Sequence, residues 1–164
     1  MKRIGLISDT HGYLDNNVFK HFEHCDEIWH AGDFGDSKIA EALKAFKPLR
    51  GVYGNIDSND IRNIFHEDLY FTIEQVNVFM QHIGGYPGKY APGVKNKIKN
   101  TKSGLFISGH SHILKIMYDD QLSCLHINPG AAGRQGWHKV RTLVRLVIDG
   151  PTMKNCEVIE LGKK

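Results

Sequence analysis

Residues 2–12 read KRIGLISDTHG, and this stretch decides how the rest of the chain can be arranged. The apolar or small residues from Ile4 to Ile7 predict a short buried strand. Asp9 and His11 then lie at the carboxyl end of that strand, where open α/β sheets bind their ligands. A carboxylate and an imidazole two residues apart can bind one cation if the backbone turns, as Gly12 allows. Taken alone, however, Asp-x-His is more typical of a loop with an Asx-type turn.

The next part of the chain alternates strand and helix patterns. Each further strand ends in a glycine and a polar residue, first Gly32-Asp33 and then Gly54-Asn55. Such alternation predicts right-handed βαβ crossovers and a parallel sheet. Ser37 is the expected N-cap of the second helix. The predicted strands are 2–7, 27–31 and 50–53, and the predicted helices are 16–24 and 38–46.

The second half of the chain has an antiparallel pattern, with a helix at 92–100 and a further buried strand at 105–108. No internal repeat, linker or low-complexity segment interrupts it. The pattern as a whole predicts one α/β (α+β) domain spanning 1–164, with two mixed sheets packed face to face and helices outside. The predicted antiparallel strands are 69–73, 76–82, 113–118, 122–127, 142–148 and 153–161.

The composition describes an ordinary globular chain. Of the 164 residues, 41% are hydrophobic and 24% charged, and the net charge is +3. There is no apolar run of the roughly 20 residues that a membrane span needs, and no signal peptide is visible. We therefore expect a cytoplasmic protein without membrane attachment.

The three cysteines form no Cys-x-x-Cys motif, so we expect reduced thiols. Lysines 95, 97, 99 and 102 indicate a solvated helix face, which makes nucleic acid an unlikely partner.

Seven potential metal ligands follow the predicted strands. All offer nitrogen or oxygen and none is a thiolate, a set that suits Mn²⁺, Fe, Zn²⁺ or Ni²⁺. Seven ligands are too many for one small cation. They suit two cations about 3.5–4 Å apart that share a carboxylate and a water, which makes that water nucleophilic near neutral pH. The seven are Asp9, His11, Asp33, Asn55, His82, His110 and His112.

These motifs together resemble the calcineurin-like metallophosphoesterase superfamily, and most of all its small bacterial and archaeal phosphodiesterases of the YfcE type. The resemblance covers about the first 130 residues, because Asn128-Pro129-Gly130 also resembles that subfamily. It implies a four-layer αββα sandwich. It also implies that Asp33 bridges two metals. Asp9, His11 and His112 would hold one of them, and Asn55, His82 and His110 the other.

The resemblance further implies a dinuclear metal-dependent phosphodiesterase that hydrolyses small phosphodiesters by attack of a metal-bound hydroxide. Mn²⁺ is the expected metal, with Ni²⁺, Fe²⁺ or Zn²⁺ as alternatives. The residues expected to act most directly in catalysis are Asp33, Asn55 and His110. The chain is expected to bind a small phosphoester and could form homo-oligomers. A non-catalytic scaffold resembling a retromer subunit and a polymer nuclease of the same superfamily are the alternatives.

Two positions depart from the superfamily's pattern. Many members have a histidine directly after the asparagine, where this chain has Ile56, and Ala131 stands where the related motif often has serine. Without that histidine, which can protonate the leaving group, substrates with poor leaving groups should suffer most, since acid catalysis contributes about 10²–10⁴-fold.

Residues beyond the seven leave several interpretations open. Arg134 could bind substrate phosphate, and Tyr86, together with Tyr90, could line the substrate pocket. Asp36 and Asp57 could each orient a ligand or cap a helix, and for Asp57 the helix cap is favoured. The remaining histidines are expected to be structural or exposed, and they are His21, His24, His30, His66, His126 and His138.

Overall fold

The computed structural model describes residues 1–164 and has two five-stranded sheets as its framework. The first sheet has the strand order β12-β11-β1-β2-β3. As predicted, β1, β2 and β3 are parallel, and β11 pairs with β1 in the antiparallel sense. Its strands are β1 (Lys2–Ile7), β2 (Glu27–His30), β3 (Leu49–Gly51), β11 (Val140–Asp149) and β12 (Thr152–Lys163).

The second sheet has the order β4-β5-β8-β10-β9. Its three central strands β5, β8 and β10 are parallel, and the outer strands β4 and β9 are antiparallel to their neighbours. A separate short hairpin, β6 (Gly85–Tyr86) and β7 (Lys89–Tyr90), lies in the loop that follows β5. The strands of the second sheet are β4 (Asp68–Ile73), β5 (Val76–Gln81), β8 (Leu105–Ile107), β9 (Lys115–Asp119) and β10 (Cys124–Asn128).

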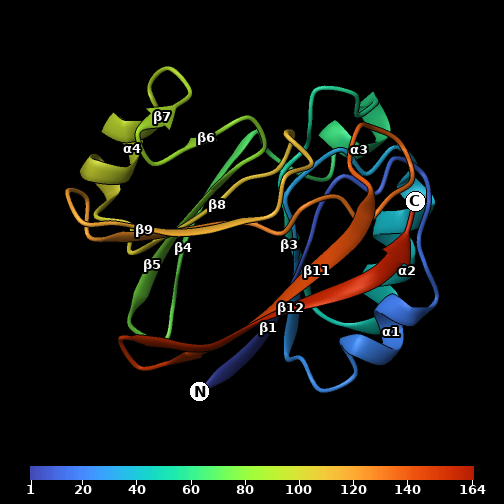
Figure 1. The fold of residues 1–164 in the computed structure, drawn as a ribbon, viewed down its shortest axis with the longest axis horizontal. Helices are drawn as coiled ribbons and strands as arrows, with labels where there is room; N and C mark the ends of the chain where they lie inside the picture. Colours follow the sequence, from blue (N-terminus) through green and yellow to red (C-terminus); the bar gives the residue numbers. More distant parts are fainter.

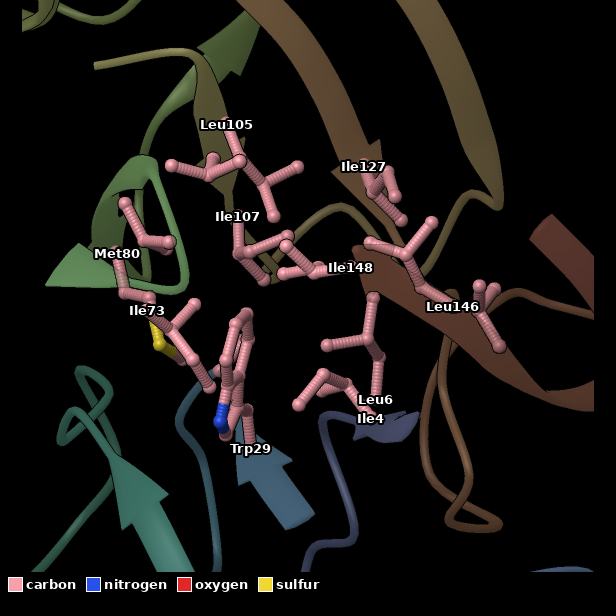
Figure 2. Close-up of a cluster of buried hydrophobic side chains, with 14 of the residues drawn as sticks. Ile4, Leu6, Trp29, Ile73, Met80, Leu105, Ile107, Ile127, Leu146 and Ile148 are labelled. Atoms are coloured by element: carbon pink, nitrogen blue, oxygen red, sulfur yellow. The ribbon is translucent and has the colours of Figure 1, made fainter. Parts of the chain in front are cut away.

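Helices cover the outer faces of both sheets, so the fold is the predicted αββα sandwich. Figure 1 shows α1 (Asn17–His21), α2 (Ser37–Phe46) and α3 (Asn59–Arg62) on the side of the first sheet, and α4 (Val94–Thr101) beyond the second. The largest apolar cluster fills the space between the sheets, where Trp29 from β2 faces Met80 from β5 (Figure 2). Burying these side chains gains about 25 cal/mol per Å² of apolar surface, which holds the two sheets together. None of the helices α1 to α4 has the length and apolar character that a membrane span needs.

Several element boundaries differ from those predicted. The first helix ends at His21 rather than at residue 24, because the chain turns back toward β2 with Cys25 N–H donating to the Phe22 carbonyl. Ser37 is the first residue of α2 rather than its N-cap. Asp36 is the cap, since its carboxylate accepts from the Lys38 N–H at 2.9 Å. The C-terminal strands are longer than expected because β11 and β12 pair along nearly their whole length.

Candidate metal centre

Loops at the carboxyl ends of five strands bring the seven predicted side chains together. Asp9 and His11 follow β1, Asp33 follows β2 and Asn55 lies beyond β3. His82 comes directly after β5 in the other sheet, and His110 and His112 follow β8. The two sheets therefore contribute to one rim of the sandwich, because the carboxyl ends of their parallel strands meet there.

One half of the site consists of Asp9, His11 and His112, whose ligand atoms all lie within 4.8 Å of one another. The Nε2 of His112 is 3.1 Å from Asp9 Oδ1 and 3.3 Å from the Nε2 of His11. Asp9 is fully buried, and its other oxygen, Oδ2, accepts from Ser8 Oγ at 2.6 Å and from the His110 N–H at 3.1 Å. These two bonds leave Oδ1 to face the imidazoles.

The other half consists of Asp33, His82 and His110, again within 4.8 Å of one another. His82 is buried, and its Nδ1 lies 2.7 Å from the Ala31 carbonyl. Because a carbonyl only accepts, Nδ1 carries a proton, and Nε2 is left to face Asp33 Oδ2 at 3.2 Å. Asn55 joins this half through its Oδ1, which is 3.0 Å from His110 Nδ1.

Five of the seven residues have a left-handed backbone. A positive φ is uncommon for residues other than glycine and costs of order 1–3 kcal/mol where the structure enforces it. Such conformations cluster at functional sites, because they turn short side chains inward directly after a strand. The five are Asp9 (φ 52°), His11 (φ 46°), Asp33 (φ 58°), His110 (φ 70°) and His112 (φ 59°).

Two glycines allow the loops to approach this closely. A Cβ at Gly54 would collide with the Asp33 carboxylate, and a Cβ at Gly109 would collide with Ser8 Oγ. The glycines of the Gly-Asn and Gly-His motifs are therefore required by packing against the neighbouring acidic loops.

Asp57 connects the loops that carry Asp33 and Asn55. Its buried carboxylate accepts three backbone N–H groups, from Asp33 at 2.9 Å, Gly35 at 2.9 Å and Gly54 at 2.8 Å. The prediction that Asp57 caps a helix is wrong, because Ser58 is the N-cap of α3. The signal in the sequence was its position two residues after Asn55, but two of the three N–H groups that it binds, those of Asp33 and Gly35, are distant in the chain.

Two histidines that the sequence did not assign to the site support its loops. His30 is fully buried, its Nε2 lies 3.0 Å from Thr10 Oγ1, and its Nδ1 accepts from the Gly32 N–H at 3.1 Å. Burial lowers the pKa of His30 to about 3, so its ring stays neutral. His138 stacks edge-on to His112 with ring centroids 5.2 Å apart, and its Nε2 lies 2.8 Å from the Gly133 carbonyl.

Both carboxylates of the site are ionised at neutral pH. Burial by itself would raise the pKa of Asp9, but the imidazoles of His11 and His112 hold it below its usual value. Burial opposes ionisation of Asp33 as well, and the adjacent His82 outweighs it and lowers the pKa of Asp33. The pocket therefore combines two anionic carboxylates with imidazoles at contact distance.

Two buried atoms at the centre show that the residues fit divalent cations. Asp9 Oδ1 and His82 Nε2 are inaccessible to solvent and have no hydrogen-bond partner. His112 Nε2 lies close to Asp9 Oδ1, but without the alignment of a hydrogen bond. Unpaired buried polar atoms are costly, and lone pairs that converge on a common space are what a cation requires.

The two predicted substrate residues have other contacts. Arg134 donates to the hydroxyl of Tyr13 at 3.0 Å, and its guanidinium lies 4.0 Å from the centre of that ring. Lys115 Nζ lies over the ring of Tyr86, at 3.8 Å from its centre. Tyr90, the other tyrosine of that loop, donates to Asp119 at 2.7 Å. Neither Arg134 nor Tyr86 shares a hydrogen bond or an ion pair with the seven residues, so their role in substrate binding stays a prediction.

The fold agrees with comparisons to known proteins. A family model described as the calcineurin-like phosphoesterase superfamily domain matches residues 1–150, and the chain belongs to this superfamily. The probable metallophosphoesterase MJ0623 of Methanocaldococcus jannaschii is 32% identical over 135 residues, which are 78% of this chain and 67% of that protein. The phosphodiesterase MJ0936 of the same organism is 27% identical over 148 residues, covering 78% of this chain and 82% of that protein.

Solved structures share the whole fold at low identity. Vps29 of Chaetomium thermophilum has a TM-score of 0.77 and 15% identity, with full coverage of both chains. A predicted phosphoesterase from Streptococcus pneumoniae has a TM-score of 0.71 and 19% identity, covering 97% of this chain and 89% of that one. At such identities these structures establish the fold, and the chemistry has to be argued from the site.

Proposed function

We propose that this chain is a dinuclear metal-dependent phosphodiesterase that acts on small phosphodiesters. The observation that carries the proposal is the position of Asp33 Oδ2 between the two halves of the site. This oxygen is 3.5 Å from the Nε2 of His11 and 3.2 Å from the Nε2 of His82. An oxygen shared in this way suits a carboxylate that bridges two cations.

The donor set also suggests which residues would hold each ion. Asp9, His11 and His112 would hold one, Asn55, His82 and His110 the other, and Asp33 both. Mn²⁺ is the metal we propose, because oxygen and imidazole donors without a thiolate suit it, as they also suit Fe²⁺, Ni²⁺ and Zn²⁺. When bound, two such ions supply Lewis acidity toward phosphoryl oxygens and lower the pKa of water.

The chain's own residues would orient the phosphoryl group. Burial and the nearby His82 lower the pKa of His110, so its imidazole is neutral at pH 7 and fits a ligand better than a proton donor. Asp33 Oδ1 accepts from the Ile56 N–H at 3.1 Å, which fixes the carboxylate plane. Asn55 adds an uncharged oxygen donor, and the two carboxylates thereby remain the only negative charges among the seven residues.

Ile56 leaves this chain without the histidine that many members of the superfamily place beside the leaving group. Its side chain is 46% exposed, and the isoleucine cannot donate a proton. Because acid catalysis contributes about 10²–10⁴-fold, the proposed substrates are diesters whose leaving group departs without protonation.

A cavity of about 340 Å³ adjoins Asn55 and His82 and could take the alcohol part of such a diester. Arg62 and Glu67 line it with Tyr53. Arg62 also supports the asparagine loop, donating from Nε to the Asp57 carbonyl at 2.8 Å and from Nη2 to the Asn55 carbonyl at 3.3 Å. Its guanidinium lies 4.4 Å from the centre of the Tyr53 ring. Since the lining is polar and carries both charges, a small hydroxylated alcohol suits the cavity better than an acyl chain.

Hydrolysis of bis(p-nitrophenyl) phosphate tests the proposal directly. The chain should release p-nitrophenol when supplied with Mn²⁺ and lose this activity in excess chelator, and Mn²⁺ returned to the chelated protein should restore it. Equal rates with and without chelator would contradict the metal mechanism. p-Nitrophenyl phosphate, assayed in parallel, measures whether diesters are preferred to monoesters.

The scaffold alternative has one observation in its favour, because Vps29 proteins share the fold. All seven positions nevertheless carry competent donors in this chain, which favours the enzyme. Metal analysis of the protein dialysed against Mn²⁺ separates the two. Close to two ions per chain with hydrolysis supports the enzyme, whereas no bound metal and no hydrolysis supports the scaffold. We also still predict that the enzyme is cytoplasmic and that it has neither nucleic acid nor a membrane as a partner.

A further inference from the structure

The strand β9 forms a free edge of the second sheet, and its apolar side chains are exposed. β9 pairs with β10 on one side only. Ile116, Met117 and Tyr118 are 41%, 43% and 53% exposed. Proteins usually protect an exposed edge strand, because its unpaired N–H and C=O groups can pair with another chain. An apolar edge strand of this kind therefore calls for a partner.

The backbone groups that point away from the sheet can be identified from the ladder. Leu125 N–H donates to the Gly104 carbonyl, and the Ile127 carbonyl accepts from the Ser108 N–H, so the backbone groups of these two residues of β10 point toward β8. The backbone groups of the residue between them, His126, therefore point toward β9, where His126 is opposite Met117. By the same alternation, the backbone groups of Ile116 and Tyr118 point outward from the edge of the sheet.

The sequence of β9 is complementary to itself when read in the opposite direction. In an antiparallel pair centred on Met117, Lys115 of one copy is opposite Asp119 of the second copy, and the same contact recurs at the other end. Ile116 is then opposite Tyr118, so the four outward-facing residues of the two copies meet as hydrogen-bonded pairs. Shifting the pairing by two residues in either direction places Lys115 opposite Met117 or Gln121 and loses both charge pairs.

We propose that two copies of this chain associate by antiparallel pairing of their β9 strands about a two-fold axis at Met117, which joins their second sheets into one. Four backbone hydrogen bonds, two Lys115–Asp119 pairs and two Ile116–Tyr118 pairs would form. A two-fold interface requires a surface that complements itself, and this register meets that requirement. The occupant that the observations favour is consequently a second copy.

Both charged residues are already held in position on the outer face of the sheet. Lys115 lies over Tyr86, and Asp119 accepts from Tyr90, so the β6–β7 hairpin orders the two ends of the strand. A lysine on an edge strand often blocks pairing. Here Asp119 of the second copy is opposite the lysine in one register only. Opposite charges across a strand pair stabilise the pair and like charges destabilise it, so the lysine favours that register.

The association should be weak, because a five-residue strand buries less than the roughly 1,200 Å² of a standard interface. Sedimentation velocity should show a monomer that converts to a dimer as the protein concentration rises from about 5 to about 500 µM. This range of about two decades suits a weak association.

The variant Ile116→Pro removes one outward N–H without touching the ladder to β10, and it should weaken dimerisation at least about tenfold. Ile116→Val keeps the N–H and should dimerise like the unmodified chain.

Charge reversal tests the register. Lys115→Glu places a second carboxylate opposite Asp119 at both ends, and Asp119→Lys creates two Lys–Lys contacts, so each variant alone should sediment as a monomer. In a mixed dimer of the two variants, opposite charges again face each other at both ends of the paired strands, so the mixture should form dimers. Because Asp119 also accepts from Tyr90, thermal unfolding of each variant checks that it is folded, and Lys115→Glu alone remains informative if Asp119→Lys is not.

Three outcomes would overturn the proposal. The chain could remain a monomer at 500 µM, it could form a dimer that Ile116→Pro and Lys115→Glu leave intact, or the mixed variants could fail to recover association although both are folded. A monomer that instead binds an extended peptide at this edge would assign β9 to a different partner. None of these readouts depends on metal content or hydrolysis.

Discussion

Asp57 accepts a hydrogen bond from the backbone N–H of Asp33 at 2.9 Å, and its carboxylate thereby fixes the backbone of Asp33, the residue that lies between the two halves of the site. The same oxygen, Oδ2, accepts from Gly54 at 2.8 Å. One buried side chain thus sets the distance between the loops after β2 and β3, one carrying a carboxylate and the other an amide.

Asp57→Asn should destabilise the metal-free protein by about 2–4 kcal/mol. The amide retains one acceptor oxygen, and its NH₂ group faces a backbone N–H that loses its partner. Metal affinity should also fall about 10- to 100-fold, since the loops that position the ligands loosen. Urea unfolding and equilibrium dialysis measure the two effects. Asp36→Asn, at the exposed cap of α2, is the matched control and should cost at most about 1 kcal/mol.

Asp33→Ala should reduce hydrolysis of an aryl phosphodiester at least about 10³-fold while the chain remains folded. The residue lies between both halves of the site, so its loss removes a shared anionic donor. Metal stoichiometry by plasma emission should fall from two ions to one or none. Asn55→Ala should weaken only the ion on the His82 side, and a stoichiometry of two in both variants would contradict the assigned ligand sets.

Ile56→His should raise kcat/KM for a diester with an alkyl alcohol as leaving group by about 10- to 100-fold. The introduced imidazole could protonate the departing oxygen, which p-nitrophenolate does not need. Rates on bis(p-nitrophenyl) phosphate should change little. Ile56→Leu serves as the control for packing, and an equal gain on both substrates would show that the histidine acts in another way.

His126 should make the fold less stable as the pH falls from about 6.5 toward 4. Burial lowers the pKa of His126 to about 4, so the unfolded chain takes up a proton in this range while the folded chain does not. The stabilising effect is complete above the unfolded pKa and is lost as the pH falls, at up to about 1.4 kcal/mol per pH unit.

Urea unfolding at several pH values, with chelator present, should give a flatter profile for His126→Gln than for the unmodified chain. The difference between the two profiles isolates His126 from the other histidines that titrate. Parallel profiles would show that the buried ring binds its proton equally well in both states.

Much of the fold could be predicted from the sequence because its signals are local. The apolar run Ile4–Ile7 marks the first strand, and Gly32 and Gly54 mark where the next two strands end. The alternation of strand and helix determines that the ends of β1, β2 and β3 meet at one edge. The donor types at those ends, without any thiolate, already pointed to divalent metals. Boundaries were less certain, as at α1, because a helix end depends on where the chain must turn.

The sequence by itself determined which residues stand at the strand ends and which chemistry their donor atoms suit. Only the tertiary structure decided that Asp57 binds the N–H groups of Asp33 and Gly35. It alone also decided that five non-glycine residues of the site adopt positive φ. The physical reason is that these features depend on packing between segments distant in the chain, which stabilises a strained backbone that the local sequence does not favour.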